Sequence, residues 1–234
     1  VAPHLYNMDG QAGAPPDPFS DNGQNWGFPT YNWTEMAKDG YLWWRQRMGQ
    51  LSRYFDAYRI DHILGFFRIW QIPLDQVEGT LGFFNPALPI MREELDARGI
   101  WFDQERYCKP FITKQLLDER FGEDVDYVRT QFLEEIRFNY FAFKPEYDTQ
   151  RKIEQFFQAP ENQDKILLQT GLYKLISNVL LLEIPGSNGR AFHPRIDLNK
   201  IYSFQNLDTV QQAKLQELYI DYFYRRQEDF WRAQ

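Results

Sequence analysis

Three side chains that could do chemistry follow one another closely near residue 60. Arg59, Asp61 and His62 come at the end of residues 56–60, which we expect to form a short buried β-strand. Side chains alternate along a strand, so Arg59 and Asp61 should point the same way. A guanidinium stabilises the charged form of a neighbouring carboxylate and orients it. An ionised Asp at the end of a parallel strand can act as a nucleophile in an α/β barrel. A strand-end ion pair without chemistry is the alternative.

Two longer stretches resemble a known family. FDAYRIDHILGFFRIWQIP, residues 55–73, is similar to the nucleophile strand of the 4-α-glucanotransferases called amylomaltases or disproportionating enzymes. GAPPDPFSDNGQNWGFPTYNW, residues 13–33, resembles the substrate loop of the same family. The likeness covers residues 1–75 closely. It is closest to the larger subtype, which acts on maltose in the plant cytosol and has a long insert after the nucleophile strand; FHPRI, residues 192–196, resembles part of that insert.

The resemblance implies a retaining transfer of glucosyl or maltosyl units from an α-1,4-glucan or maltose to an acceptor glucan, without a cofactor. It assigns the nucleophile to Asp61, oriented by Arg59. The residues that match the family's sugar-contacting positions are His62, Trp26, Asp17 and Gln24.

Two of these positions also have structural interpretations. His62 would face the other side of the strand from Asp61 and also fits a structural histidine. Asp17 also fits a residue that caps the turn after Pro16. Trp26 lies on a loop rich in Gly and Pro, which favours a stacking surface for sugar over a core residue.

Retention of configuration at the anomeric carbon requires a second carboxyl group. The sequence contains only imitations of it, meaning segments that resemble the expected motifs without fitting them. The family places its acid/base Glu in a GEDLG-like segment, but residues 122–125 follow apolar residues at helical spacing. Glu183 precedes Pro185 and Gly186, which makes it a plausible turn residue. Residues 195–197 repeat the letters RID after a proline, which indicates a loop. The acid/base and a third carboxylate are therefore expected after Gln234 in a longer enzyme, and the isolated chain is expected to be inactive.

Composition excludes several other classes of function. Net charge is −7 and there is no basic patch, which argues against a nucleic-acid partner. We find no apolar run long enough to span a membrane, and we expect a cytoplasmic protein with Cys108 reduced. His4 and His193 have no metal-ligand spacing, so no metal is predicted. Aromatic residues make up 18% of the chain, which suits a protein that binds glycans.

The resemblance implies an α/β fold, a fragment of a (β/α)8 TIM barrel with a mainly helical insert. Residues 1–75 are predicted to belong to the catalytic barrel, residues 76–207 to the insert, and residues 208–234 to a long helix leading back to the barrel. Residues 1–33 are predicted to be loop and 35–55 one helix. Further helices are predicted at 89–97, 111–120, 148–158, 162–178 and 208–231, strands at 137–143 and 179–184, and either state at 126–133.

Two rival functions remain open from the sequence. An α-glucan hydrolase would use water as the acceptor, and its main product would be glucose rather than a ladder of longer glucans. A glycan-binding or purely structural piece would keep the aromatic residues and leave Asp61 idle. The oligomeric state is not predicted.

Overall fold

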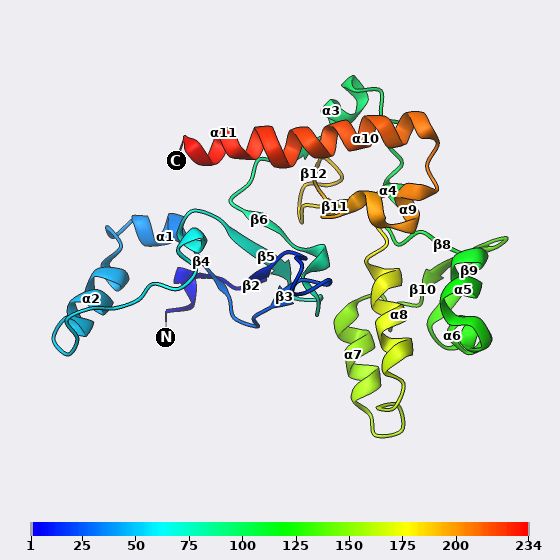
Figure 1. Cartoon of the computed structure of the whole chain (residues 1–234), viewed down its shortest axis with the longest axis horizontal. Helices are drawn as coiled ribbons and strands as arrows, with labels where there is room; N and C mark the ends of the chain where they lie inside the picture. Colours follow the sequence, from blue (N-terminus) through cyan, green and yellow to red (C-terminus); the bar gives the residue numbers. More distant parts are fainter. Residues whose placement is uncertain (1, 234) are drawn as a thin grey trace.

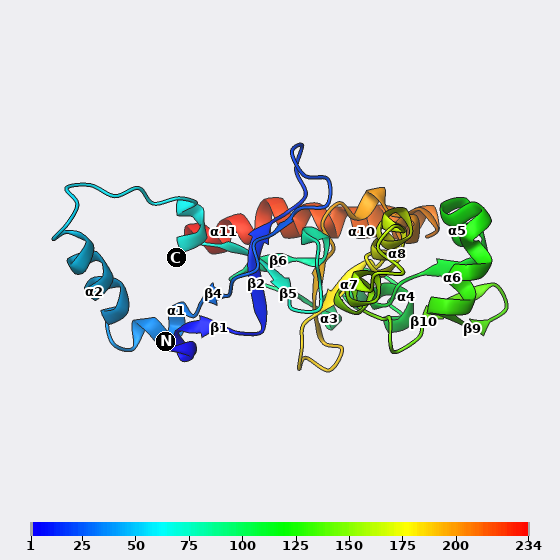
Figure 2. The same ribbon diagram turned by 90° about the horizontal axis from the view of Figure 1, so that it is seen from below.

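A computed structural model describes residues 2–233 as a mixed α/β structure that is drawn out along one axis (Figures 1 and 2). All strand pairs in the described part are antiparallel, in sheets of two to four strands, and these strands do not close into a barrel. The elements of residues 2–85 are β1 (Tyr6–Asn7), β2 (Gly10–Ala14), β3 (Gln24–Asn25), β4 (Thr30–Tyr31), α1 (Trp33–Ala37), α2 (Leu42–Leu51), β5 (Ile69–Pro73) and β6 (Phe83–Asn85).

The remaining residues contain most of the helices. Their elements are β7 (Ile90–Met91), α3 (Arg92–Ala97), α4 (Gln104–Cys108), β8 (Ile112–Thr113), α5 (Lys114–Phe121), α6 (Val125–Phe132), β9 (Leu133–Arg137), β10 (Tyr140–Phe143), α7 (Gln150–Gln158), α8 (Ile166–Ile176), β11 (Leu181–Glu183), β12 (Ala191–Pro194), α9 (Tyr202–Gln205), α10 (Thr209–Asp221) and α11 (Gln227–Arg232).

The central sheet has the strand order β3-β2-β5-β6. The pairing of β2 with β5 aligns Gly10 with Pro73 and Gly13 with Trp70. The prediction that residues 1–33 are loop was therefore wrong for β1 to β4. The glycines and prolines there do mark turns, but the strands between them are held by partners far away in the sequence, which local signals do not reveal.

The helix predicted at residues 35–55 is broken into α1 and α2. Gly40 and Tyr41 both have positive φ angles, 67° and 59°, which a continuous right-handed helix excludes. The Asp39 carboxylate then accepts a hydrogen bond from the Leu42 N–H and caps α2. The sequence DG at 39–40 is a turn signal that the apolar spacing of residues 43–55 obscured.

The strand predicted at residues 56–60 is absent. These residues follow α2 as an exposed, irregular stretch and lead to a 3-10 helix, Ile63–Phe66. Figure 2 shows this stretch running out from α2 and back toward the sheet. A strand needs a neighbour to pair its backbone groups, and no strand in the described part of the chain lies beside this one.

Two apolar cores hold the second half of the chain together. One includes Phe132, Ile153 and Leu172 and lies among α5 to α8 and the β8-β10-β9 sheet. The other includes Phe192 and Leu218 and lies under α3, α4 and α10 beside the β11-β12-β7 sheet. Helices α7 and α8 lie side by side, and α10 and α11 run along one edge of the molecule back toward the central sheet (Figure 1).

Several element boundaries differ from the predictions. The strand predicted at 137–143 is a hairpin, because Asn139 takes a positive φ of 62° and turns the chain between β9 and β10. The ambiguous stretch 126–133 is the helix α6. The helices predicted at 89–97, 111–120 and 162–178 begin later, at Arg92, Lys114 and Ile166. The long C-terminal helix contains a π-helical turn, Tyr222–Arg226. The structure contains no helix among residues 2–233 that is long and apolar enough to cross a membrane.

Candidate active site

The hairpin between β2 and β3 projects from the central sheet (Figure 2). At its tip, Oδ1 of Asp17 accepts hydrogen bonds from the N–H groups of Phe19 and Ser20, both at 2.8 Å. The Ser20 hydroxyl donates to the Gly23 carbonyl at 2.7 Å. Asp17 thus caps its own turn, which is the structural role that competed with sugar contact in the sequence analysis.

Trp26 follows the second strand of this hairpin. Its N–H donates to the Ala12 carbonyl at 2.9 Å, so the backbone is fixed to β2. Its indole Nε1–H donates to Oε1 of Gln24 at 3.1 Å. The Phe28 ring stacks against the indole with centroids 6.0 Å apart. The indole is only partly buried, which leaves surface for a ligand.

The His62 ring contacts Trp26, which lies much earlier in the sequence. The two ring centroids are 5.2 Å apart at an interplanar angle of 83°, an edge-to-face contact. His62 has a positive φ of 52°, and a Cβ atom on Gly65 would lie 2.9 Å from the imidazole Cδ2. Glycine at position 65 therefore allows the turn to close on the histidine ring.

Asp61 and Arg59 form an ion pair beside His62. The guanidinium NH2 lies 3.1 Å from Oδ1 of the carboxylate, and both side chains are 87% exposed. The two side chains form this pair although the backbone is not in a strand, so the strand alternation used to predict their pairing does not apply here. An exposed pair of this kind contributes little to folding stability, about 0–1 kcal/mol.

The stretch that carries Asp61 makes a second attachment, to helices α1 and α2. Phe66 packs against Trp33 and Trp44, with centroid distances of 5.4 Å and 5.2 Å. Trp44 in turn contacts Trp43 and Tyr31, so an aromatic cluster joins α1, α2 and β4. These tryptophans are partly buried and pack against one another.

The structure therefore brings together three of the predicted sugar-contacting residues, Gln24, Trp26 and His62. The Arg59–Asp61 pair adjoins them through the backbone of His62. Asp17 lies at the hairpin tip and is occupied with its turn. The two imitations of the acid/base lie on other elements: Glu123 is exposed in a 3-10 turn after α5, and the Glu183 carboxylate on β11 accepts hydrogen bonds from Gly189 and Gln104.

A polar network that the sequence analysis missed holds the base of the hairpin. Oε1 of the fully buried Gln150, on α7, accepts hydrogen bonds from the N–H groups of Val77 and Glu78, both at 2.9 Å. The Glu78 carboxylate accepts one from Nδ2 of Asn22 at 2.8 Å. Burial raises the pKa of Glu78.

A parallel link joins α7 to the strand beside Trp26. The Arg151 guanidinium donates to Oε1 of Gln11 at 3.1 Å, and Nδ2 of Asn25 donates to the same oxygen at 2.9 Å. These contacts connect residues up to 140 positions apart, and we find no local sequence signal that would have revealed them. Helix α7 therefore fixes the hairpin that presents Trp26.

His193, for which the sequence analysis found no metal partners, is buried in the second core. Its ring stacks on Phe83 with centroids 4.6 Å apart, and its Nδ1 lies 2.6 Å from the Tyr222 hydroxyl. Burial lowers the pKa of His193 to about 4, which keeps the ring neutral. Within residues 2–233 the structure groups no three His, Cys, Asp or Glu side chains as a metal site.

Comparisons with known proteins identify the family of the chain. The family model described as 4-alpha-glucanotransferase, glycoside hydrolase family 77, matches residues 1–234. The 4-alpha-glucanotransferase DPE2 of rice is 41% identical over 239 residues, which cover 99% of this chain and 25% of the rice protein. The 4-alpha-glucanotransferase of Aquifex aeolicus is 44% identical over 128 residues, 46% of this chain and 26% of that protein.

Several solved chains were also matched. An amylomaltase from Streptococcus agalactiae in complex with acarbose is 20% identical, with a TM-score of 0.35 over 97% of this chain and 54% of that one. That score is too low to carry a structural argument, so the assignment depends on the sequence matches. The chain spans about a quarter of the length of these two relatives. It belongs to the 4-alpha-glucanotransferase family.

Proposed function

We propose that this chain is the nucleophile-bearing part of a 4-α-glucanotransferase that moves glucosyl or maltosyl units between α-1,4-glucans or maltose and an acceptor glucan. The observation that carries the proposal is the exposed Asp61 carboxylate, held by Arg59 and adjoining a histidine that packs on a partly exposed tryptophan. Family membership supports the same reaction.

The proposed chemistry proceeds in two displacements. The Asp61 carboxylate attacks the anomeric carbon, the bond to the leaving oxygen breaks, and a covalent glycosyl–enzyme intermediate forms. A second carboxyl group protonates the leaving oxygen, and in the second step it removes the proton from the acceptor's 4-hydroxyl. We place that group in the part of the protein that this chain does not span. Arg59 orients Asp61 and keeps its charge available for attack.

The remaining roles concern binding. The indole of Trp26 offers an aromatic face to the apolar face of a sugar ring, and Gln24 fixes the indole through its Nε1–H. His62 and Gln24 supply polar groups beside that surface. Asp17 contributes by shaping the turn and with its remaining carboxylate oxygen. The reaction needs no cofactor or metal ion.

The proposed organisation follows the sequence analysis. Residues 1–75 would belong to the catalytic (β/α)8 barrel, residues 76–207 to an insert and residues 208–234 to a helix that leads back to it. In the structure, β6 from the insert pairs with β5, and the network around Gln150 crosses the same boundary, so the two parts are closely joined. We place the enzyme in the cytoplasm. The isolated chain carries one of the two carboxyl groups and should not convert substrate.

The test is a product analysis of the full-length protein with maltotriose. A transferase yields glucose together with a ladder of longer glucans, because the acceptor is another sugar. Glucose and maltose without longer products would show hydrolysis and contradict the proposal. No change in the substrate, with the Asp61→Asn variant as the blank, would favour a glycan-binding role.

A further inference from the structure

A second cleft lies in the half of the molecule that faces away from Asp61. It has a volume of about 870 Å³ and lies between α4, the β8-β10 pair and the start of α10. Figure 2 shows that these elements and the stretch after α2 lie toward opposite ends of the molecule. Ligand pockets commonly measure about 300–1,000 Å³, so the cleft is large enough for a small molecule or a short stretch of polymer.

An exposed tryptophan stands at the edge of this cleft. Trp101 is 84% exposed, which is unusual for so large an apolar side chain. Its backbone is nevertheless held in place: the Trp101 N–H donates to Oε1 of Gln211 at 2.9 Å, and Lys214 donates to the Gly99 carbonyl at 2.6 Å. Helix α10 therefore presents the indole on a fixed support. An exposed indole on a backbone that is held in place can stack on a ligand.

Unpaired polar atoms complete the lining. One carboxylate oxygen of Asp103 accepts from the Arg106 N–H, and one of Asp208 accepts from the Val210 and Gln211 N–H groups. The second oxygen of each carboxylate has no hydrogen-bond donor in the part of the chain that the structure describes. Tyr107 also lines the cleft, but its hydroxyl is not exposed to solvent and has no partner among these residues.

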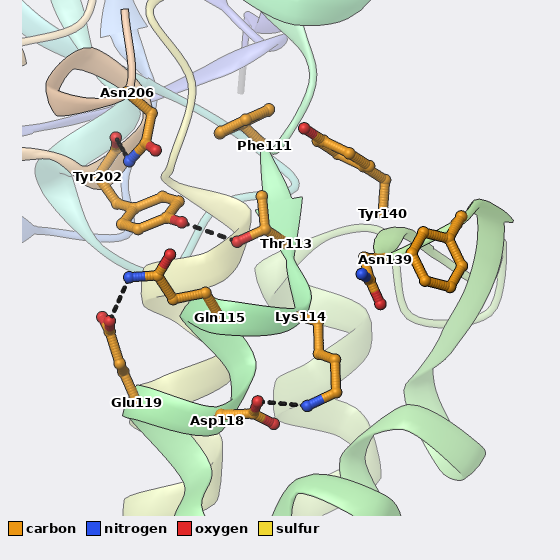
Figure 3. Close-up of a pocket in the computed structure, with 11 residues that line it drawn as sticks. Phe111, Thr113, Lys114, Gln115, Asp118, Glu119, Asn139, Tyr140, Tyr202 and Asn206 are labelled. Carbon is orange, nitrogen blue, oxygen red and sulfur yellow. Dashed lines mark hydrogen bonds and ion pairs between the residues drawn. The ribbon is translucent and has the colours of Figure 1, made fainter.

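The adjoining hollow differs in this respect. It measures about 580 Å³ and shares Phe111, Tyr140 and Asn206 with the cleft. Figure 3 shows pairs among its polar side chains. The pairs are Thr113 with Tyr202, Lys114 with Asp118, and Gln115 with Glu119. Most of the polar side chains around this hollow therefore already have a partner.

We propose that this cleft is a second glucan-binding site, which holds a stretch of α-glucan away from Asp61 and keeps the polymer on the protein between transfers. The proposal rests on the proposed function for the choice of ligand. An aromatic face and carboxylate oxygens suit a neutral ligand rich in hydroxyl groups. Asp103 and Arg106 line the same wall, so the cleft has no single charge that would favour an anion or a cation.

The test measures binding and its location in the full-length Asp61→Asn variant, which cannot consume the ligand. Hydrogen exchange is followed as maltoheptaose is added. We expect protection of residues 99–108 and 206–212, with its own saturation curve. Adding Trp101→Ala should raise the dissociation constant for this protection about fivefold to tenfold, and Trp101→Phe should restore most of it.

A matched control is Tyr224→Ala, which removes another exposed ring outside the cleft and should change nothing. The proposal would be overturned if maltoheptaose gave no protection of these residues in the Asp61→Asn variant, or if adding Trp101→Ala left the dissociation constant unchanged. In the active enzyme, Trp101→Ala should lower the rate on glycogen at low concentration and leave the rate on maltotriose unchanged. An equal loss of rate on glycogen and on maltotriose would also contradict a binding site separate from Asp61. Failure of the proposed function would appear independently, as the absence of longer products from maltotriose.

Discussion

Residues 52–68 and the second half of the chain bury their apolar side chains to very different degrees. In the stretch that carries Asp61, the exposed large apolar side chains are Tyr54, Phe55, Tyr58, Ile60, Ile63, Leu64 and Phe67. In the second half, Phe132, Leu172 and Phe192 are fully buried in two continuous cores. Both stretches are rich in apolar residues, so composition does not distinguish them.

The difference concerns which contacts each stretch makes within the described residues. The helices of the second half cover their own apolar faces with neighbours from the same half. The Asp61 stretch is attached through His62 on Trp26 and Phe66 on Trp33 and Trp44. An uncovered apolar surface of this kind marks an interface. Because the matched relatives are about four times longer, we infer that the rest of such a protein covers it.

This comparison predicts that Asp61 matters for chemistry and not for folding. In the full-length protein, Asp61→Asn should lower kcat by several powers of ten, because an amide cannot form the glycosyl intermediate. The melting temperature should stay almost the same, because the pair with Arg59 is exposed. Initial rates on maltotriose and a thermal melt measure the two effects.

The control is Asp56→Asn, which removes an exposed carboxylate from the same stretch, five residues earlier. Its activity should remain close to that of the unaltered protein. A rate for Asp61→Asn within about tenfold of the unaltered protein, or about 1.4 kcal/mol of barrier, would remove Asp61 from the role of nucleophile.

Titration or replacement of His193, in the second half of the chain, should change the stability of the fold and leave the transfer activity unchanged. Folded His193 has a pKa of about 4, below the value of 6.5 for an unperturbed histidine. The unfolded chain therefore binds a proton at a higher pH than the folded chain does. Unfolding then becomes easier as pH falls from about 6.5 to about 4, by at most roughly 3 kcal/mol. Denaturant unfolding at several pH values measures this slope.

The double variant His193→Phe with Tyr222→Phe should flatten the slope in this window, since both ends of the buried polar contact are removed together. The matched control, His4→Ala, replaces an exposed histidine and should leave the slope as it was. An identical pH dependence in the double variant and the unaltered protein would show that His193 is not responsible. Transfer activity at pH 7 should be the same in all of these proteins.

The same contrast explains which elements the sequence could predict. Helices α7 and α10 were expected because their signals are local. Thr149 and Asp208 cap the first turn of each, and apolar residues recur at helical spacing after the caps. The strand β11 was likewise found from a short apolar run. Each of these elements is specified by residues within about one turn or one strand length.

Elements that depend on distant partners were missed. Strand β2 contains two glycines and reads as loop, yet it is held by β5, about sixty residues later. Residues 56–60 read as a strand, yet no strand among residues 2–233 pairs with them. For the candidate site, the local sequence places Arg59, Asp61 and His62 next to one another, and their roles stay predictions. The hold of Gln150 and Arg151 on the hairpin depends on tertiary contacts that a single sequence does not reveal.

Trp26 joins the two regions, and its replacement should have the smallest effect. It lies on the hairpin that α7 fixes, and it contacts His62 on the exposed stretch. In Trp26→Ala, loss of the stacking face should raise KM for maltotriose about fivefold, on the order of 1 kcal/mol. The melting temperature should change little, because the hydrogen bond from the backbone N–H to Ala12 remains and the indole is only partly buried. Trp26→Phe keeps an aromatic face and should recover most of the affinity. A large drop in melting temperature with an unchanged KM would instead assign the indole to packing. The stretch around Asp61 would then need Trp26 for its folded conformation, and the indole would not bind the sugar on which Asp61 acts.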